Sequence, residues 1–127
     1  MKKLMIAVCM FFTSIASNVY ADGHGNIKMG IILGFTGPIE SLTPAMAASA
    51  ELAFNEASDS GSLLGGKKIK VERADSTCVD SAAATSAAEG LVSNGVVAIM
   101  GADCSGVTGA IASNVAVPNG VVMILSL

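Results

Sequence analysis

The chain contains four apolar segments of strand length, and alanine-rich segments of helical length separate them. The apolar segments are residues 27–35, 68–74, 96–100 and 121–125. Of these, 68–74 alone alternates between apolar and charged positions, whereas the other three are almost continuously apolar. A regular alternation of strand and helix segments predicts an α/β layer built on a parallel sheet.

The separating segments carry signals for the start of a helix. The predicted helices are Pro44–Ser58, Asp80–Ser93 and Gly106–Val115. Thr43 precedes Pro44 and is the predicted N-cap of the first helix, because hydroxyl side chains favour that position and proline favours the first turn. Asp80 or Val79 opens the second helix and Ser105 the third.

The same pattern predicts the order of the strands. Continuously apolar strands are buried on both faces and belong inside a parallel sheet, whereas an alternating strand suits an edge. The order 2-1-3-4 follows, in an open parallel sheet with helices on both faces. The fourth strand is as apolar as the central ones and would leave a bare edge. We therefore expect the fold to continue past Leu127 and the chain to be truncated there.

The amino-terminal residues predict a secretory signal peptide over residues 1–21. Lys2 and Lys3 precede a short apolar stretch, and small residues follow with the spacing Val19-x-Ala21. We expect cleavage after Ala21 and export to a bacterial periplasm, which leaves residues 22–127 as one small α/β unit. A lipoprotein anchor is disfavoured, because the residue before Cys9 is not small.

Charge and residue types then exclude several classes of function. Of the 7 basic and 10 acidic side chains, Lys2 and Lys3 leave with the signal peptide, so the mature chain is acidic and has no electrostatic footprint for nucleic acid. The loop 34–41 lacks the G-x-G-x-x-G spacing of a dinucleotide site. No Ser-His, Cys-His or metal-binding cluster is present in the sequence. We therefore expect no enzymatic activity, no cofactor and no metal site in the mature domain.

Cys78 and Cys104 are the cysteines that remain after cleavage. An even pair in an oxidising compartment predicts a disulfide between the loops that follow the second and third strands. Such a bond would stabilise the fold by about 3–4 kcal/mol through loop entropy. The alternative is two buried free thiols.

Ser105 is the candidate binding residue of the third strand-to-helix loop. Ligands of open parallel sheets bind beyond the carboxyl ends of the strands. A hydroxyl there, with the amides of Gly106 and Val107 at a helix start, suits a carboxylate. The alternative is that Ser105 only caps its own helix. A nucleophilic serine is disfavoured, because no histidine is placed to activate it.

Several ordered motifs resemble one family. They are Phe35-Thr36-Gly37-Pro38, Ala53-Phe54-Asn55-Glu56-Ala57, Leu64-Gly65-Gly66-Lys67-Lys68, Asp75-Ser76-Thr77-Cys78 and Gly101-Ala102-Asp103-Cys104-Ser105. Over residues 27–127 the chain resembles the amino-terminal part of periplasmic solute-binding proteins of the leucine/isoleucine/valine-binding family, which serve ABC importers. The resemblance implies part of the first lobe of a type I periplasmic binding protein, whose two lobes close over a small amino acid or related solute.

The resemblance also implies site residues. The cysteine pair is bridged in that family, and the serine after the second cysteine binds the ligand carboxylate, which corresponds to Ser105. The candidate ligand-binding set is Ser105, Asp103, Gly106, Ser41, Leu42 and Ser126. Ser41 and Leu42 occupy a region where the family often places an aromatic residue, and Ser126 begins the loop after the fourth strand.

The predicted function is that of an extracytoplasmic receptor of an ABC importer. It would bind a branched-chain or other small amino acid, or a related carboxylate or amide, and would deliver it to a membrane permease. The alternatives are a ligand-sensing ectodomain of the same fold, an exported α/β enzyme, and a truncated fragment without function.

His24 is the sole histidine. Cleavage after Ala21 would place it third from a free amine, and such an arrangement of nitrogens suits Cu(II) or Ni(II). The simpler interpretation is a solvated residue in a flexible lead-in.

Overall fold

A computed structural model describes residues 25–125. The predicted signal peptide, His24 and Ser126 lie outside these residues. The elements are β1 (Ile27–Leu33), α1 (Thr43–Asp59), η1 (Leu63–Gly65), β2 (Ile69–Asp75), α2 (Ser81–Ser93), β3 (Ala98–Gly101), α3 (Ser105–Ile111), η2 (Ala112–Ala116), α4 (Val117–Asn119) and β4 (Val122–Ile124). All the predicted strands and helices are present, with bounds shifted by a few residues.

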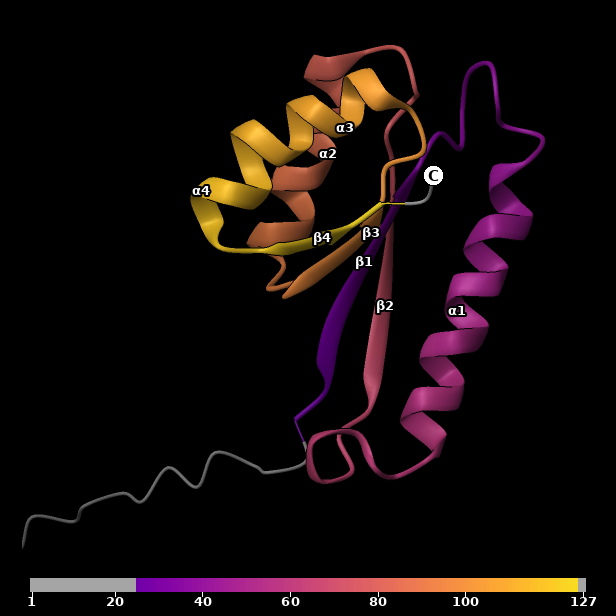
Figure 1. The fold of residues 1–127 in the computed structure, drawn as a ribbon, viewed down its shortest axis with the longest axis vertical. Helices are drawn as coiled ribbons and strands as arrows, with labels where there is room; N and C mark the ends of the chain where they lie inside the picture. Colours follow the sequence, from indigo (N-terminus) through magenta and orange to yellow (C-terminus); the bar gives the residue numbers. More distant parts are fainter. Residues whose placement is uncertain (1–24, 126–127) are drawn as a thin grey trace, which may run out of the picture.

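The strands form one parallel sheet in the order β2-β1-β3-β4, which confirms the predicted order (Figure 1). β1 lies at the centre because its apolar residues need cover on both sides. Ile31, Ile32 and Leu33 are completely buried. β2, with its alternating charged residues, lies at an edge, where one row of side chains meets water.

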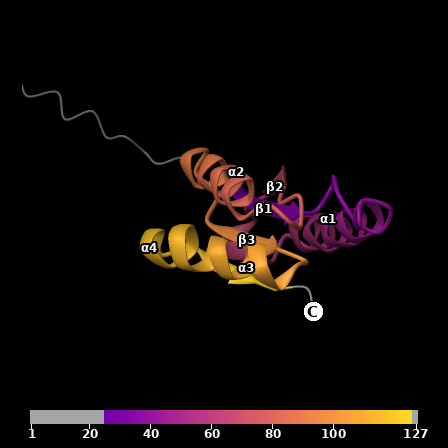
Figure 2. The same cartoon turned by 90° about the horizontal axis from the view of Figure 1, so that it is seen from above.

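Helices cover both faces of the sheet, as predicted. Figure 2 shows α1 apart from α2 and α3, which pack together on the other face. Because successive side chains of a strand point to opposite faces, Ile32 joins the core under α2 and α3, whereas Ile31 and Leu33 face α1. In the described part of the chain, no helix is long and apolar enough to cross a bilayer.

The third helix is longer than predicted. The expected end was Val115, but α3 passes through the π-helical segment η2 into α4 and ends at Asn119. Gly120 then adopts a left-handed conformation with φ 64°, which is a common helix stop. The Asn119 side chain donates to the Val115 carbonyl oxygen at 2.8 Å within this last part of the helix.

The predicted cap of α1 is wrong, whereas the predicted cap of α2 is confirmed. Thr43 is the first residue of α1, and Leu42 precedes it without a side-chain cap bond. The buried Thr43 hydroxyl donates instead to the Gly34 carbonyl oxygen at 3.1 Å and so ties α1 to the end of β1. The Asp80 carboxylate accepts from the amides of Ala82 and Ala83, as an N-cap does.

Candidate ligand-binding site

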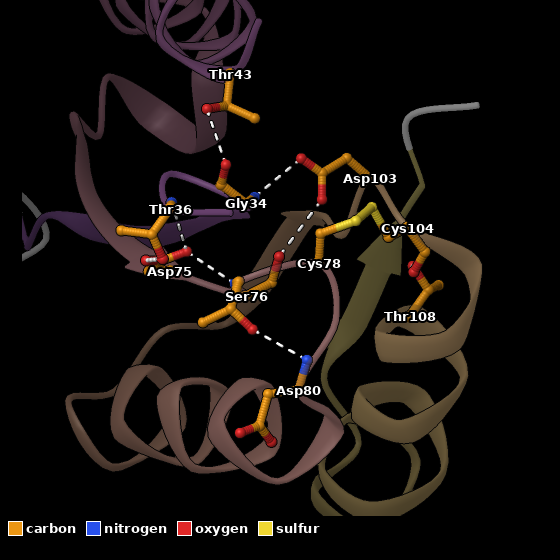
Figure 3. Close-up of a disulfide and its surroundings, with 11 residues drawn as sticks. Gly34, Thr36, Thr43, Asp75, Ser76, Cys78, Asp80, Asp103, Cys104 and Thr108 are labelled. Carbon is orange, nitrogen blue, oxygen red and sulfur yellow. Dashed lines mark hydrogen bonds between the residues drawn. A yellow bond between two sulfur atoms is a disulfide. The ribbon is translucent and has the colours of Figure 1, made fainter. Parts of the chain in front are cut away.

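The carboxyl ends of β1, β2 and β3 meet at one edge of the sheet, and the loops that follow them form the candidate site (Figure 3). In the strand register, Leu33 lies beside Asp75 and Ile32 beside Gly101. This is the edge at which ligands bind in open parallel sheets. The topology therefore brings together loops that are far apart in the sequence.

A disulfide joins Cys78 to Cys104, which confirms the predicted pairing. The two Cα atoms are 5.2 Å apart, and the bond links the loop after β2 to the loop after β3. The disulfide lies close to the loop after β1. A Cβ placed on Gly34 would be only 3.2 Å from the Cys78 Cβ. The bond therefore fixes the residue that precedes Ser105.

Asp103 is a second link among the same loops. Its Oδ2 accepts from the Gly34 amide at 2.9 Å, and its Oδ1 accepts from the Ser76 hydroxyl at 3.4 Å. Ser76 is completely buried, and its own amide donates to the Leu33 carbonyl oxygen at 2.9 Å. Asp103 thus holds the ends of three strands together (Figure 3).

Asp75 anchors the loop after β1. Its carboxylate accepts from the Thr36 hydroxyl at 2.6 Å, from the Thr36 amide at 3.3 Å and from the Thr77 amide at 2.8 Å. Partial burial works against ionisation of Asp75, but these hydrogen bonds outweigh it and hold the pKa of the carboxyl below its usual range. Gly37 lies close by, with φ 97°, and a Cβ there would be 2.6 Å from the Thr77 carbonyl oxygen. A side chain does not fit there.

Gly101 is the point at which β3 turns into the site. Its φ is 121°, and a Cβ there would collide with the carbonyl oxygen of Ile32. β3 can therefore approach β1 this closely only with glycine at this position.

A hollow of about 570 Å³ opens beside the start of α3. It is lined by Ala102, Asp103, Ser105, Thr108, Gly109, Ala112 and Leu125. The Ser105 side chain is exposed, and among the described residues its hydroxyl has no hydrogen-bond partner. Cys104 is the N-cap of α3 and makes no side-chain cap bond, so the alternative in which Ser105 caps its own helix is wrong.

The structure brings together only part of the candidate set. Asp103 and Ser105 line the hollow. Gly106 follows on α3 and is exposed but does not line it. Ser41 and Leu42 are exposed in the loop before α1 and also do not line it. Ser126 lies outside the described residues.

Five residues of the hollow were not predicted: Thr108, Gly109, Ala112, Leu125 and Ala102. Together with Ser105, the first three have the spacing i, i+3, i+4 and i+7, which defines one face of a helix. This spacing was available from the sequence once Ser105 was placed at a helix start. The position of Leu125 at the hollow could not be predicted in this way, because Leu125 follows β4 and lies at the hollow only through the order of the strands.

Residues 26–126 match the family model described as periplasmic binding protein. The chain belongs to the periplasmic binding protein family. Members of this family reside in the periplasm or elsewhere outside the cytoplasm. Among curated proteins, no sequence matches the chain.

Several solved structures are similar to this periplasmic binding protein. The branched-chain amino acid transporter substrate-binding protein LivJ from Streptococcus pneumoniae, in complex with isoleucine, has 31% identity and a TM-score of 0.71 over 80% of this chain. The leucine-binding protein LivK from Thermotoga maritima has 25% identity and a TM-score of 0.65 over 78% of this chain. An ABC-type branched-chain amino acid transporter from Rhodopseudomonas palustris, at 24% identity and a TM-score of 0.69 over 80%, shares the fold.

The chain spans only a part of these relatives. It covers 28% of the pneumococcal LivJ, 27% of the Thermotoga LivK and 27% of the Rhodopseudomonas protein. The parallel sheet and its helices therefore correspond to a little over a quarter of each of these relatives.

Proposed function

We propose that this chain is part of an extracytoplasmic receptor that captures a small amino acid, or a related carboxylate or amide, for an ABC importer. The observation that carries the proposal is the Ser105 hydroxyl, which lines the hollow and has no hydrogen-bond partner among residues 25–125, in a chain of the periplasmic binding protein family. Proteins of this family are transport receptors, not enzymes.

The start of α3 supplies the chemistry for a carboxylate. The Thr108 amide is the first of the helix to bond back, to the Cys104 carbonyl oxygen at 2.9 Å. The amides of Gly106 and Val107 precede it and have no partner within the helix. Together with the Ser105 hydroxyl they offer donors to an anionic group, at the positive end of a helical stretch that continues to Asn119.

The remainder of the hollow suits an apolar substituent. Ala102, Ala112 and Leu125 contribute hydrocarbon to its wall, and Gly109 leaves room beside them. A carboxylate at Ser105 with an aliphatic side chain along this wall is consistent with isoleucine, the ligand in the LivJ complex. The proposed ligands are therefore branched-chain or other small amino acids and their close analogues.

The proposed receptor also needs parts that this chain does not contain. A second lobe would close over the ligand and complete the cleft, and ligand would favour the closed state through contacts made only there. The closed form would be recognised by a membrane permease. Residues 1–21 would direct export and be removed after Ala21.

Replacement of Ser105 by alanine tests the proposal. In the full-length protein, Ser105→Ala should weaken L-isoleucine binding about tenfold or more, because a hydrogen bond to a charged group is lost. Its free energy of unfolding should stay unchanged, because the hydroxyl has no hydrogen-bond partner among residues 25–125. Isothermal titration calorimetry measures the first quantity and urea denaturation the second.

The matched control is Ser86→Ala, which removes an exposed hydroxyl from α2, away from the hollow. It should leave affinity unchanged. Equal affinities of Ser105→Ala and wild type would remove Ser105 from the site. Failure of the wild-type protein to bind any amino acid, carboxylate or amide would overturn the proposed function.

A further inference from the structure

We propose that the mature amino terminus, Asp22-Gly23-His24, binds one Cu(II) ion, and Ni(II) more weakly, ahead of the α/β unit. His24 stands third in a chain that begins at Asp22. The inference goes beyond amino acid capture and shares with the proposed function only the removal of residues 1–21. Cleavage after Ala21 creates a free amine at Asp22, and that amine is the first metal ligand.

Four nitrogen atoms of these residues are covalently placed to surround a single ion. They are the Asp22 amine, the backbone nitrogens of Gly23 and His24, and Nδ1 of the His24 ring. Consecutive donors along one short peptide close small fused rings, and the four nitrogens form a square. Cu(II) and Ni(II) prefer such square nitrogen sites, and Cu(II) binds more tightly than Ni(II). Neither position 23 nor 24 is proline, so both backbone amides carry a proton that they can lose.

The charge balance of the complex favours this site. On binding, the ammonium proton of Asp22 and the two amide protons pass to water, while His24 binds as the neutral imidazole. The two amide anions then cancel the charge of the divalent ion. Lys28 and Lys70, near the amino ends of β1 and β2, therefore do not repel the complex. Zn(II) favours a tetrahedral site and should bind far more weakly.

The described residues that follow His24 leave the terminus open to water. Gly25 and Asn26 are exposed and belong to no helix or strand. The next residue, Ile27, begins β1, and its amide donates to the Lys68 carbonyl oxygen at 2.8 Å. The proposed ligands therefore precede an exposed stretch of backbone, and binding an ion there needs no change in the sheet.

Residues 25–125 offer no competing site for these ions. That part of the chain has no group of three or more His, Cys, Asp and Glu residues that could hold a metal ion. Cys78 and Cys104 are joined in the disulfide, so neither offers a thiolate. His24 is also the sole histidine of the sequence. Tight binding of Cu(II) that depends on His24 therefore reports on the amino terminus.

The proposed metal site is remote from the hollow at the start of α3. β1 has 7 residues, and a strand rises about 3.3 Å per residue, so its two ends lie about 20 Å apart. The metal site precedes the amino end of β1, whereas the hollow beside Ser105 lies at the carboxyl edge of the sheet. Copper should therefore leave the affinity for an amino acid unchanged, and the two activities can be tested separately.

The test begins with the full-length protein, exported and processed by the cell. Mass spectrometry should show a mature chain that starts at Asp22. Titration with Cu(II) against a competing chelator of known affinity should reveal a tight site, and electron paramagnetic resonance should show tetragonal Cu(II) with nitrogen ligands. A mature chain that starts at another residue, or one without the tight site, overturns the inference.

The decisive variant exchanges two residues, as His24→Asn together with Asn26→His. It keeps the composition of the chain but moves the imidazole to a position from which it cannot complete the square. Because Asn26 is exposed, the fold should not change. The affinity for Cu(II) should fall at least about a hundredfold, since the imidazole leaves the chelate. Equal affinities of this variant and the wild type would remove the site from the amino terminus.

A second variant keeps all three residues and adds one alanine before Asp22 in the mature chain. The free amine is then one residue too far from His24, and the affinity for Cu(II) should again fall. Unchanged affinity would contradict the role of the amine and overturn the inference. Calorimetry with L-isoleucine, with and without Cu(II), separates the two proposals. A wild-type protein that binds Cu(II) at the terminus but no amino acid supports the inference and overturns the proposed function alone.

Discussion

The loops at the site use the same residue types in two different ways. Around the loops after β1 and β2, at residues 34–43 and 76–80, three hydroxyls are engaged in hydrogen bonds that build the edge. Thr36 donates to Asp75, Thr43 to Gly34 and Ser76 to Asp103. At the start of α3, the Ser105 hydroxyl has no such bond among the described residues. Polar groups already paired shape a site, and those left free are available to a ligand.

The difference follows from what lies within reach of each hydroxyl. At the loops after β1 and β2, the hydroxyls of Thr36 and Ser76 reach carboxylates, and that of Thr43 reaches the Gly34 carbonyl oxygen. Ser105 follows a cysteine that the disulfide holds in place, and it opens onto the hollow. Composition alone does not separate these cases, because both regions are rich in glycine and hydroxyl residues.

The largest effect on stability should come from a substitution that pushes the end of β3, and with it the start of α3, away from β1. In Gly101→Ala the new Cβ collides with a backbone carbonyl, which cannot rotate away as a side chain can. We expect a loss of more than about 4 kcal/mol in the free energy of unfolding, near the upper end for single substitutions. Urea denaturation of the full-length protein measures it.

The control for Gly101→Ala is Gly90→Ala in α2, where a Cβ meets nothing within 4 Å. This change should be neutral or stabilising by up to about 1 kcal/mol, because alanine favours helix. Similar stabilities of the two variants would show that β3 can shift away from Ile32 at little cost.

Removal of the link between the loops should have the next largest effect. The double variant Cys78→Ser and Cys104→Ser opens a loop of sequence separation 26. We expect a loss of about 3–4 kcal/mol, which is the loop-entropy value for this length. Thermal unfolding with and without reductant measures it. If reductant destabilises the double variant as much as the wild type, the effect does not come from this bond.

The smallest effect concerns Asp75 and appears as pH dependence. Its pKa is lower in the folded state than in the unfolded chain, so ionised Asp75 stabilises the fold above its unfolded pKa of about 4. That stabilisation is lost as pH falls through the lower pKa that Asp75 has in the folded state. Thr36→Val removes a main donor and should flatten the stability profile in this range, as chemical denaturation at pH 2–6 would show.

Ser105→Ala serves as the control for the Asp75 profile, because the donors to the Asp75 carboxylate are Thr36 and Thr77 and not Ser105. Its stability should follow the wild-type curve at every pH. A flattened curve for Ser105→Ala would contradict the division between paired and free hydroxyls.

Much of the fold was predictable because it depends on hydrophobic pattern. The continuous apolar character of residues 27–35 and the alternation of 68–74 indicate which strand is central and which is at the edge. The disulfide followed from counting cysteines. The end of the third helix was missed because the helical stretch continues past Val115 through η2 and α4, and only the left-handed Gly120 stops it.

The site was less predictable because its contacts depend on three-dimensional positions. Ser105 was identified through a helix start and a family resemblance. The bonds of Asp103 and Thr43 both involve Gly34, and no local pattern indicates that its amide and carbonyl lie within their reach. The hollow also depends on Leu125, which enters only because β4 lies beside β3.

The central position of β1 also constrains how the chain is made. Ribosomes synthesise proteins from the amino end, so β1 emerges first. Its two partners, residues 69–75 and 98–101, are made later. Until then Ile31, Ile32 and Leu33 form an apolar strand with both edges open, which is prone to aggregate. The strand order that gathers three loops at one edge therefore also leaves the most apolar strand without one of its neighbours until residue 101 has been made.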